Sequence, residues 1–244
     1  MLFRSIMLLH ECVSSEQARC TVMADRVSVE DLGSASGTYV NEERIREPAT
    51  LKDGGLLRLR PLHFKFLSRN RIERLFHHEL YRQATMGAGT QIFNKRYLLD
   101  TLKAEFQSSR VHGRPLSVIY YGLDFFKKVN DTRGHHCGDY VLRESARVAK
   151  SCLRKDDSYG RYGGEKFLVV LPNTALNVAV ELAERIRNAL QAHPFTFEDK
   201  MLSQIVSMGV SQMRPEFETH EALLGDAGRK RYQSKHGGRN RVTA

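Results

Sequence analysis

The stretch that decides the fold of the larger part of this chain reads Arg161-Tyr162-Gly163-Gly164-Glu165-Lys166-Phe167. It leads into the apolar run Lys166 to Leu171, which is typical of a buried strand. A second β-rich apolar run, Leu116 to Leu123, lies upstream. The other predicted elements are helices at Arg96 to Ser109, Tyr140 to Cys152, Ala175 to Gln191 and Glu221 to Ser234, and a strand at Ser203 to Val210. Strands that alternate with helices predict a layered sheet with helices packed on it.

Four further motifs surround this stretch and follow one another in a fixed order. They are Thr90 to Arg96 (TQIFNKR), Phe126 to Asp131 (FKKVND), Gly134 to Asp139 (GHHCGD) and Lys235 to Asn240 (KHGGRN). Together with RYGGEKF they resemble the GGDEF domain of diguanylate cyclases over nearly all of residues 85 to 244. The resemblance implies an α/β domain with a nucleotide-cyclase-like sheet that is wrapped by helices. It also implies that Gly163 and Gly164 form a hairpin turn, where missing side chains let GTP approach the backbone.

The residues at the implied active site depart from the family pattern. Diguanylate cyclases join two GTP molecules with loss of pyrophosphate and use Mg²⁺, which prefers carboxylate and phosphate oxygens. Gly122 stands where the family has its metal-binding Asp in the pattern D-x-D-x-F-K, and Asp124 is the second Asp, which does not replace it. Glu165 keeps one acid of the signature, whereas Lys166 replaces the next. Because a cation repels a divalent metal, we expect no cyclase activity, no catalytic residue and no required magnesium or other cofactor.

Two more departures lie on the predicted helix Glu221 to Ser234. Lys230 and Arg231 stand where the family has small and apolar residues, just before Tyr232. These replacements agree with the expected loss of cyclase activity.

Parts of the implied GTP site are retained beside Gly163 and Gly164. Asn130 and Asp139 match the pair that recognises guanine, and an amide with a carboxylate suits the donors and acceptors of that base. Lys235 and Arg239 match the contacts to the triphosphate. Weak GTP binding without turnover and a purely structural role for these residues both stay open. A smaller hypothesis is that the Lys166 ammonium holds GTP phosphates without magnesium.

The sequence also retains an R-x-x-D motif, Arg154-Lys155-Asp156-Asp157, shortly before the signature. Its position matches the inhibitory site at which cyclic di-GMP binds in the family, and Arg185 falls where the family supplies a second Arg. Arg154 can donate two hydrogen bonds to guanine O6 and N7, and Asp157 can accept from the N–H groups of the other edge. The resemblance therefore implies that Arg154, Asp157 and Arg185 bind cyclic di-GMP. The alternative is an ordinary solvated surface ion pair.

Three functions follow from these observations. The leading hypothesis is a catalytically inactive, degenerate cyclase that acts as a receptor for cyclic di-GMP and passes the signal to a protein partner. The alternatives are a residual diguanylate cyclase and a docking scaffold that binds no nucleotide. Because the ligand often binds in this family as a stacked pair that bridges two chains, a homodimer is a further expectation.

The first part of the chain has a different pattern. Short apolar runs are separated by Gly, Asp and Asn, which predicts an all-β sandwich. These runs are Thr21 to Met23, Arg26 to Val29, Thr38 to Val40, Leu56 to Leu59 and His63 to Leu67. Val29 to Asn41 (VEDLGSASGTYVN), with the turn Lys52 to Gly55, resembles the core of an FHA domain. We expect a truncated sandwich, because the chain begins too late for the first strands of that family.

FHA domains hold phosphothreonine with an Arg and with hydroxyl groups, and this chain keeps only part of that set. Ser14 matches, whereas Ser15 and Gln17 occupy the Arg and His positions. We therefore predict that the FHA-like domain binds an unidentified signalling protein without requiring phosphate. The predicted partner-binding residues are Ser14, Ser34, Ser36 and Thr38. A structural module that only sets orientation is the alternative.

Length and composition agree with two domains. The chain has 244 residues, and we predict an FHA-like domain at 1–67, a linker helix at 68–84 and a degenerate GGDEF domain at 85–244. A net charge of +10 suits a phosphate-rich ligand, and nucleic acid is a minor alternative. The four cysteines show no metal-ligand spacing. Without a membrane-spanning run or a secretory signal, we expect no membrane partner and a cytoplasmic protein that a partner can recruit to a site such as a cell pole.

Overall fold

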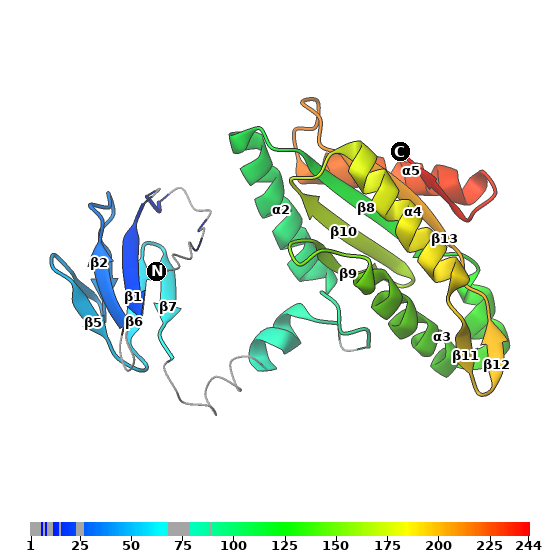
Figure 1. Ribbon diagram of the computed structural model, residues 1–244, viewed down its shortest axis with the longest axis horizontal. Helices are drawn as coiled ribbons and strands as arrows, with labels where there is room; N and C mark the ends of the chain where they lie inside the picture. The colour runs from blue at the N-terminus through cyan, green and yellow to red at the C-terminus, as the bar shows by residue number, and fades with distance from the viewer. Residues whose placement is uncertain are drawn as a thin grey trace. The chain divides into compact units, whose positions relative to one another are not determined.

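The computed structural model describes residues 6, 8, 12–14, 16–22, 27–67, 79–87 and 89–244. These residues divide into two compact units, one up to Tyr81 and the other from Arg82 onward (Figure 1). Residues 68–78 of the predicted linker lie outside the described residues, as do Ser15, Met23 and Arg26, whereas residues 79–85 are helical. Among the described residues, no helix is both long and apolar enough to cross a membrane.

The first unit is an all-β sandwich, as the sequence predicts. One sheet has the order β1-β2-β5 and the other has the order β4-β3-β6-β7, with all neighbours antiparallel. The strands are β1 (Ala18–Val22), β2 (Val27–Asp31), β3 (Thr38–Val40), β4 (Glu43–Arg44), β5 (Ala49–Leu51), β6 (Leu56–Leu59) and β7 (Leu62–Lys65). Residues of both sheets share one core: Val27, Val29, Val40, Leu51, Leu57 and Leu59. The strands β4 and β5 were not predicted, because two or three residues carry too little periodicity.

The second unit is built on one five-stranded sheet with the order β14-β13-β8-β10-β9 (Figure 1). The central strand β8 (Leu116–Leu123) is buried along its whole length and pairs antiparallel with both β10 (Lys166–Pro172) and β13 (Val206–Gln212). The outer strands are β9 (Ser158–Gly163), antiparallel to β10, and β14 (Arg241–Thr243), parallel to β13. A short hairpin of β11 (Phe195–Phe197) and β12 (Lys200–Leu202) stands apart from this sheet.

Helices cover both faces of the sheet, which confirms the predicted α/β layers. On one face, α2 (Lys95–His112) and α5 (His220–His236) share a core with Val118 and Tyr120 of β8. On the other face, α3 (Phe126–Ser151) and α4 (Leu176–Ala192) pack on Ile119 and Tyr121. Alternate residues of one strand point to opposite faces, so the unbroken apolar run of β8 serves two cores.

The signature forms the β9–β10 hairpin, as the resemblance implies: Gly163 ends β9 and pairs with Lys166, and Gly164 and Glu165 form the turn. Gly163 has a φ of 150° and Gly164 has a φ of 56°, both in the region that favours glycine. The strand register places Lys166 opposite Gly122 of the neighbouring strand. The hairpin therefore brings the two departures of the signature site together.

Two predicted boundaries are corrected by the structure. The helix predicted at Tyr140 to Cys152 begins at Phe126, with a break at Gly134, where φ is 81° and ψ is 164°. Strand β13 runs from Val206 rather than from Ser203, because the Gln204 side chain donates to the backbone oxygens of Asp124 and Ile205 outside the ladder.

Candidate functional site

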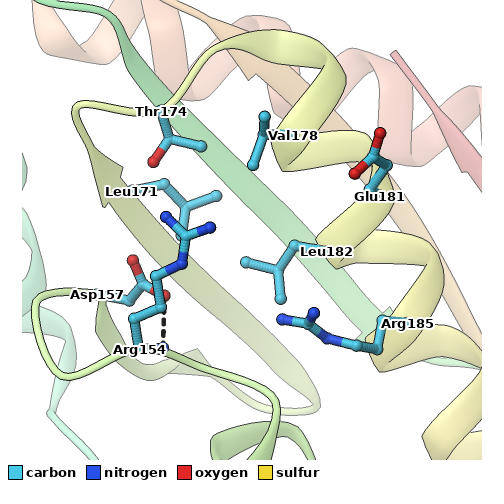
Figure 2. A pocket seen from close by; sticks show the side chains of 8 residues that line it. All are labelled: Arg154, Asp157, Leu171, Thr174, Val178, Glu181, Leu182 and Arg185. Carbon is cyan, nitrogen blue, oxygen red and sulfur yellow. Dashed lines mark hydrogen bonds between the residues drawn. The ribbon is translucent and has the colours of Figure 1, made fainter.

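The R-x-x-D motif forms a tight turn between α3 and β9. An oxygen of the Asp157 carboxylate accepts a hydrogen bond of 2.8 Å from the backbone N–H of Arg154. In return, the N–H of Asp157 donates to the backbone oxygen of Arg154 at 3.3 Å. The three-residue spacing therefore lets Arg154 and Asp157 bond to each other across the turn. The Arg154 side chain projects beside the carboxylate (Figure 2).

Arg185 enters the same place from α4, on the other side of the cavity (Figure 2). Its Nη2 donates to the backbone oxygen of Cys152 at 2.7 Å, which holds the guanidinium close to the turn. Arg154, Asp157 and Arg185 line a cavity of about 70 Å³, with Leu171 and Leu182 among its apolar walls. The structure thus brings together the three residues that the sequence analysis assigned to one site.

The charges of this cavity are arranged for a ligand that has both donors and acceptors. Partial burial raises the pKa of the Asp157 carboxyl, while the Arg154 backbone bond and the charges of Arg154 and Arg185 act to lower it. Among the described residues, the Arg154 guanidinium makes no hydrogen bond and no ion pair within the chain. A free guanidinium fork beside a carboxylate can contact both edges of a guanine base.

A second and larger cavity, of about 550 Å³, lies beside the signature hairpin. It contains most of the predicted GTP-contacting residues: Asn130, Asp139, Gly164, Lys235 and Arg239. Gly163 ends the adjoining strand β9 and does not line the cavity. The structure adds Lys127, Arg161, His135 and the exposed Phe125, over whose ring the Arg239 guanidinium lies 4.7 Å from the centroid.

The break in α3 explains how Asn130 and Asp139 come to line the same cavity. Gly134 turns the chain between them, and Gly138 then passes so close to Asn130 that a methyl group on Gly138 would collide with the Asn130 Oδ1 atom. The two glycines of GHHCGD are the signal in the sequence for this arrangement. Helical periodicity alone does not indicate it, because Gly134 interrupts the helix.

Gly122 faces cations rather than carboxylates. A methyl group on Gly122 would lie 3.2 Å from Nη1 of Arg231 and 3.8 Å from Cγ of Lys166. The Arg231 guanidinium also lies 5.4 Å from the ring centroid of Tyr120. The sequence shows that Arg231 departs from the family pattern, but the position of Arg231 beside Gly122 depends on how α5 packs on the sheet.

These side chains do not fit the magnesium that the resemblance to cyclases implies. Mg²⁺ prefers carboxylate oxygens in a near-octahedral arrangement. Position 122 offers no carboxylate, and Arg231 and Lys166 place positive charge beside it. Within the described parts of the chain, no group of three or more His, Cys, Asp or Glu side chains is placed to hold a metal ion.

Asp124 has a structural environment of its own. It is 3% exposed and accepts hydrogen bonds from the Ser207 hydroxyl at 2.9 Å and from the Asn240 backbone N–H at 3.3 Å. Burial raises its pKa, and those bonds, with the nearby charges of Arg239 and Lys235, act in the opposite direction. Asp124 therefore holds the segment that carries Arg239 instead of pointing to the place of the missing acid.

In the first unit, the predicted partner-binding hydroxyls are used within the fold. The Ser34 and Thr38 hydroxyls donate to Asp31 at 2.6 and 2.5 Å, and Thr38 is fully buried. These bonds outweigh desolvation and lower the pKa of Asp31. The remaining two hydroxyls tie neighbouring loops together, because Ser14 accepts from the Ala35 N–H and Ser36 donates to the Cys12 oxygen. The geometry leaves Thr38 no surface for a partner.

Gln17, which stands at the family's His position, is a residue whose role sequence reasoning missed. It is 7% exposed, and its amide donates to the oxygen of Gly37 and to the Thr38 hydroxyl, while its oxygen accepts from the Ser14 N–H. Gln17 therefore links the loop that contains Ser14 to Gly37 and Thr38 of the FHA-like motif through buried hydrogen bonds.

Comparisons with known proteins agree with this architecture. Residues 84–241 match the family model described as the GGDEF domain of diguanylate cyclases, and residues 3–60 match that of the FHA domain. The chain is 36% identical over 168 residues to diguanylate cyclase A of Treponema denticola, which covers 68% of this chain and 45% of the relative. The chain thus spans less than half the length of that curated relative.

Solved structures show the same fold for the second unit. The GGDEF domain of DgcB from Caulobacter crescentus, crystallised in complex with c-di-GMP, has a TM-score of 0.64 and 30% identity, and the match covers 66% of this chain and 95% of that one. The diguanylate cyclase SiaD from Pseudomonas aeruginosa, solved with its activator SiaC, has a TM-score of 0.65 and 35% identity, covering 71% of this chain and 66% of that one.

Proposed function

This chain belongs to the family of diguanylate cyclase GGDEF domains, and from that premise we propose that it is a catalytically inactive member that serves as a receptor for cyclic di-GMP. The observation that carries the proposal is the meeting of Arg154, Asp157 and Arg185 at one cavity. The similar domain of DgcB supports it, because that protein was crystallised with c-di-GMP.

The chemistry of the cavity suits one guanine base of the ligand. The Arg154 fork donates to O6 and N7, and the Asp157 carboxylate accepts from the N–H groups on the other side of the base. Arg185 supplies a second cation for a phosphate or for stacking on a base. A cavity of about 70 Å³ admits only part of a dinucleotide, so the rest of the ligand lies on the surface and is free to contact a second chain.

The loss of catalysis is proposed from the residues around Gly122. A metal-dependent transfer between two nucleotides needs carboxylates to hold Mg²⁺. Here glycine takes one such position, Lys166 takes another, and the Arg231 guanidinium lies against the glycine. Positive charge at these places disfavours the cation on which the reaction depends, so the protein needs no metal cofactor for its role as a receptor.

The FHA-like unit is the proposed output of the signal. It is a separate compact unit with its own core, and its internal use of Ser34 and Thr38 favours docking through its surface loops over capture of a phosphate. We assign to it an unidentified signalling protein as partner, which can bring the receptor to a specific place in the cytoplasm such as a cell pole. The SiaD structure shows one cyclase relative held by a protein partner.

The test is calorimetric titration of cyclic di-GMP into the whole chain. Wild type is expected to bind, and Arg154→Ala is expected to lose about 1 to 3 kcal/mol of binding free energy, the usual value of a good Arg–guanine contact. Lys155→Ala is the matched control, since this neighbouring cation is exposed and does not line the cavity. An equal loss in both variants would reduce the effect to general charge, and no binding by wild type would favour the nucleotide-independent scaffold.

Turnover decides between the receptor and a residual cyclase. With GTP and either Mg²⁺ or Mn²⁺, the wild-type protein is expected to form no cyclic di-GMP above background. Product formation that depends on the protein and on the metal would contradict the proposed inactivity, whatever the result of the binding experiment.

A further inference from the structure

The cations around Gly122 form a cluster that the receptor function does not use. It comprises Arg231 of α5 and Lys166 of β10, and we call it the Gly122 cation pair. The two residues come from positions far apart in the sequence. Both replace residue types that the sequence analysis expected to be uncharged or acidic.

Close packing between α5 and the sheet fixes the position of Arg231. At Gly209 of β13, a methyl group would collide with the backbone of α5 at Ala227 and at Arg231 itself. Gly209 in turn pairs with Tyr120 of β8. The helix backbone is therefore pressed onto the strand next to Gly122, and the Arg231 guanidinium lies over the face of that glycine. An Asp in place of Gly122 would have occupied this volume.

Neither cation forms an ion pair within the described residues of the chain. The side chains of Arg231 and Lys166 make no hydrogen bond and no ion pair, and the buried Nε of Arg231 has no partner. On the same helix, Arg229 and Lys230 both pair with Asp226, at 2.9 and 3.0 Å. Partly buried charge without a partner is unfavourable unless an anion neutralises it. The Gly122 cation pair thus lacks the carboxylate partner that Arg229 and Lys230 have on the same helix.

The neighbouring cavity is also rich in positive charge. Its wall includes Leu123, which follows Gly122 in the sequence, and Glu165, which precedes Lys166. Its lining includes four cations and two carboxylates: Lys127, Arg161, Lys235, Arg239, Asp139 and Glu165. The buried Asp124 adds a third carboxylate from behind, where it faces Arg239 and Lys235. The volume of about 550 Å³ lies within the range of roughly 300 to 1,000 Å³ that is usual for small-molecule sites.

We propose that Arg231 and Lys166 replace the divalent metal of this site by fixed positive charge, so that the cavity binds the phosphate chain of a nucleoside triphosphate without metal. The guanidinium offers a planar fork that matches phosphate oxygens, and the ammonium offers a mobile point charge. The cations of the cavity wall extend the field along the chain of phosphates. This second ligand site is separate from the R-x-x-D cavity and does not depend on it.

The proposal fixes the sign of the magnesium effect. In a metal-dependent nucleotide site, added Mg²⁺ strengthens binding because it bridges phosphate and carboxylate oxygens. Here Mg²⁺ bound to the free nucleotide cancels the negative charge that the Gly122 cation pair attracts, and the pair repels the metal. Binding is therefore expected to be strongest with a chelator present and to weaken when Mg²⁺ is added.

The experiment titrates GTP, and separately inorganic triphosphate, into the whole chain by calorimetry, first with EDTA and then with excess Mg²⁺. Both probes are expected to bind in EDTA, and Arg231→Met is expected to weaken binding at least about tenfold, as for loss of a charge-assisted contact. Arg229→Met is the matched control, because it removes the same charge from the same helix at a side chain that is 68% exposed. Lys166→Met provides a second variant.

Each outcome decides the proposal. Absence of binding in EDTA, binding that requires Mg²⁺, or equal binding by Arg231→Met and Arg229→Met would overturn it. Binding of GTP without binding of inorganic triphosphate would also overturn it, since the base would then carry the affinity. The circular dichroism spectrum and thermal unfolding of each variant, compared with wild type, report that the domain is folded. Because the receptor proposal depends on Arg154, failure of one proposal leaves the other standing.

Discussion

Two sites of the second unit lie at opposite ends of one strand, β9, and are lined by different combinations of charge. The R-x-x-D turn before the strand combines a carboxylate with two guanidinium groups, so its charges complement one another and suit a base. The signature turn after it places Lys166 opposite Gly122, with Arg231 against the glycine, and we propose that this positive charge repels a metal and attracts an anion. On this proposal, a fold keeps the shape of a nucleotide site while the sign of the charge around it removes the need for a metal.

The largest expected effect comes from reversing the altered site. A variant that combines Gly122→Asp, Lys166→Glu and Arg231→Leu restores acids and removes the Gly122 cation pair. Because each well-placed electrostatic group is worth on the order of 10² to 10³ in rate, formation of cyclic di-GMP from GTP and Mg²⁺ is expected to rise from background to measurable turnover. The measurement is product formation, with Arg229→Leu added to wild type as the control. No product, in a variant that still binds cyclic di-GMP, would place the loss of activity elsewhere.

The next effect is on stability. It tests whether the packing of α5 supports the triphosphate site but not the R-x-x-D site. Gly209→Ala places a methyl group against the α5 backbone, and overpacking of this kind typically costs about 1 to 3 kcal/mol. Chemical denaturation is expected to show this loss, together with weaker triphosphate binding by the folded protein. Gly225→Ala is the control, since its nearest neighbouring atom is 4.0 Å away. An equally large loss of cyclic di-GMP binding would contradict the expectation that α5 packing supports the triphosphate site alone.

A third prediction concerns the carboxylate of the R-x-x-D turn. Asp157→Asn keeps an oxygen for the Arg154 N–H, but it removes the negative charge that the guanine N–H groups require. A charge-assisted hydrogen bond is worth about 1.5 to 3 kcal/mol, so cyclic di-GMP affinity is expected to fall accordingly in calorimetry. Asp156→Asn, at an exposed position outside the cavity, serves as the control. Triphosphate binding is expected to be unchanged in both.

The pH dependence of the two sites is expected to differ. Because burial raises the pKa of Asp157 and the ligand requires the ionised form, cyclic di-GMP affinity falls as the pH is lowered toward that pKa, from a higher pH than an ordinary aspartate would give. Below the pKa the loss approaches about tenfold per pH unit. Triphosphate binding does not use Asp157, so its change with pH should be the same in wild type and in Asp157→Asn. A pH dependence of cyclic di-GMP affinity that persists unchanged in Asp157→Asn would contradict the assignment.

The smallest effect is expected at the middle of the R-x-x-D turn. Lys155→Ala removes an exposed cation near a charged ligand, and at physiological ionic strength such a charge is largely screened. Cyclic di-GMP affinity is expected to change by about twofold or less. A larger loss would show that general positive charge, rather than the geometry of Arg154 and Asp157, carries the affinity.

Much of the fold could be predicted from local patterns. The unbroken apolar run Leu116 to Leu123 predicted a central strand, and the periodicity of Ala175 to Gln191 predicted α4. Prediction failed where geometry is set by single residues or distant contacts. The first half of α3 was missed because Gly134 interrupts its pattern, and β14 was missed because three residues become a strand only by pairing with β13.

The candidate sites divide in the same way. The sequence by itself determined which side chains are present: the retained Arg154 and Asp157, the glycine at position 122 and the lysine at position 166. Only the tertiary structure decided what these residues face. Arg185 meets the R-x-x-D turn because α4 crosses the sheet there, and Arg231 covers Gly122 because α5 packs against Gly209. Each residue has its chemical identity from the sequence alone. The charge around a site, in contrast, comes from several distant segments, and these become neighbours only when the chain packs.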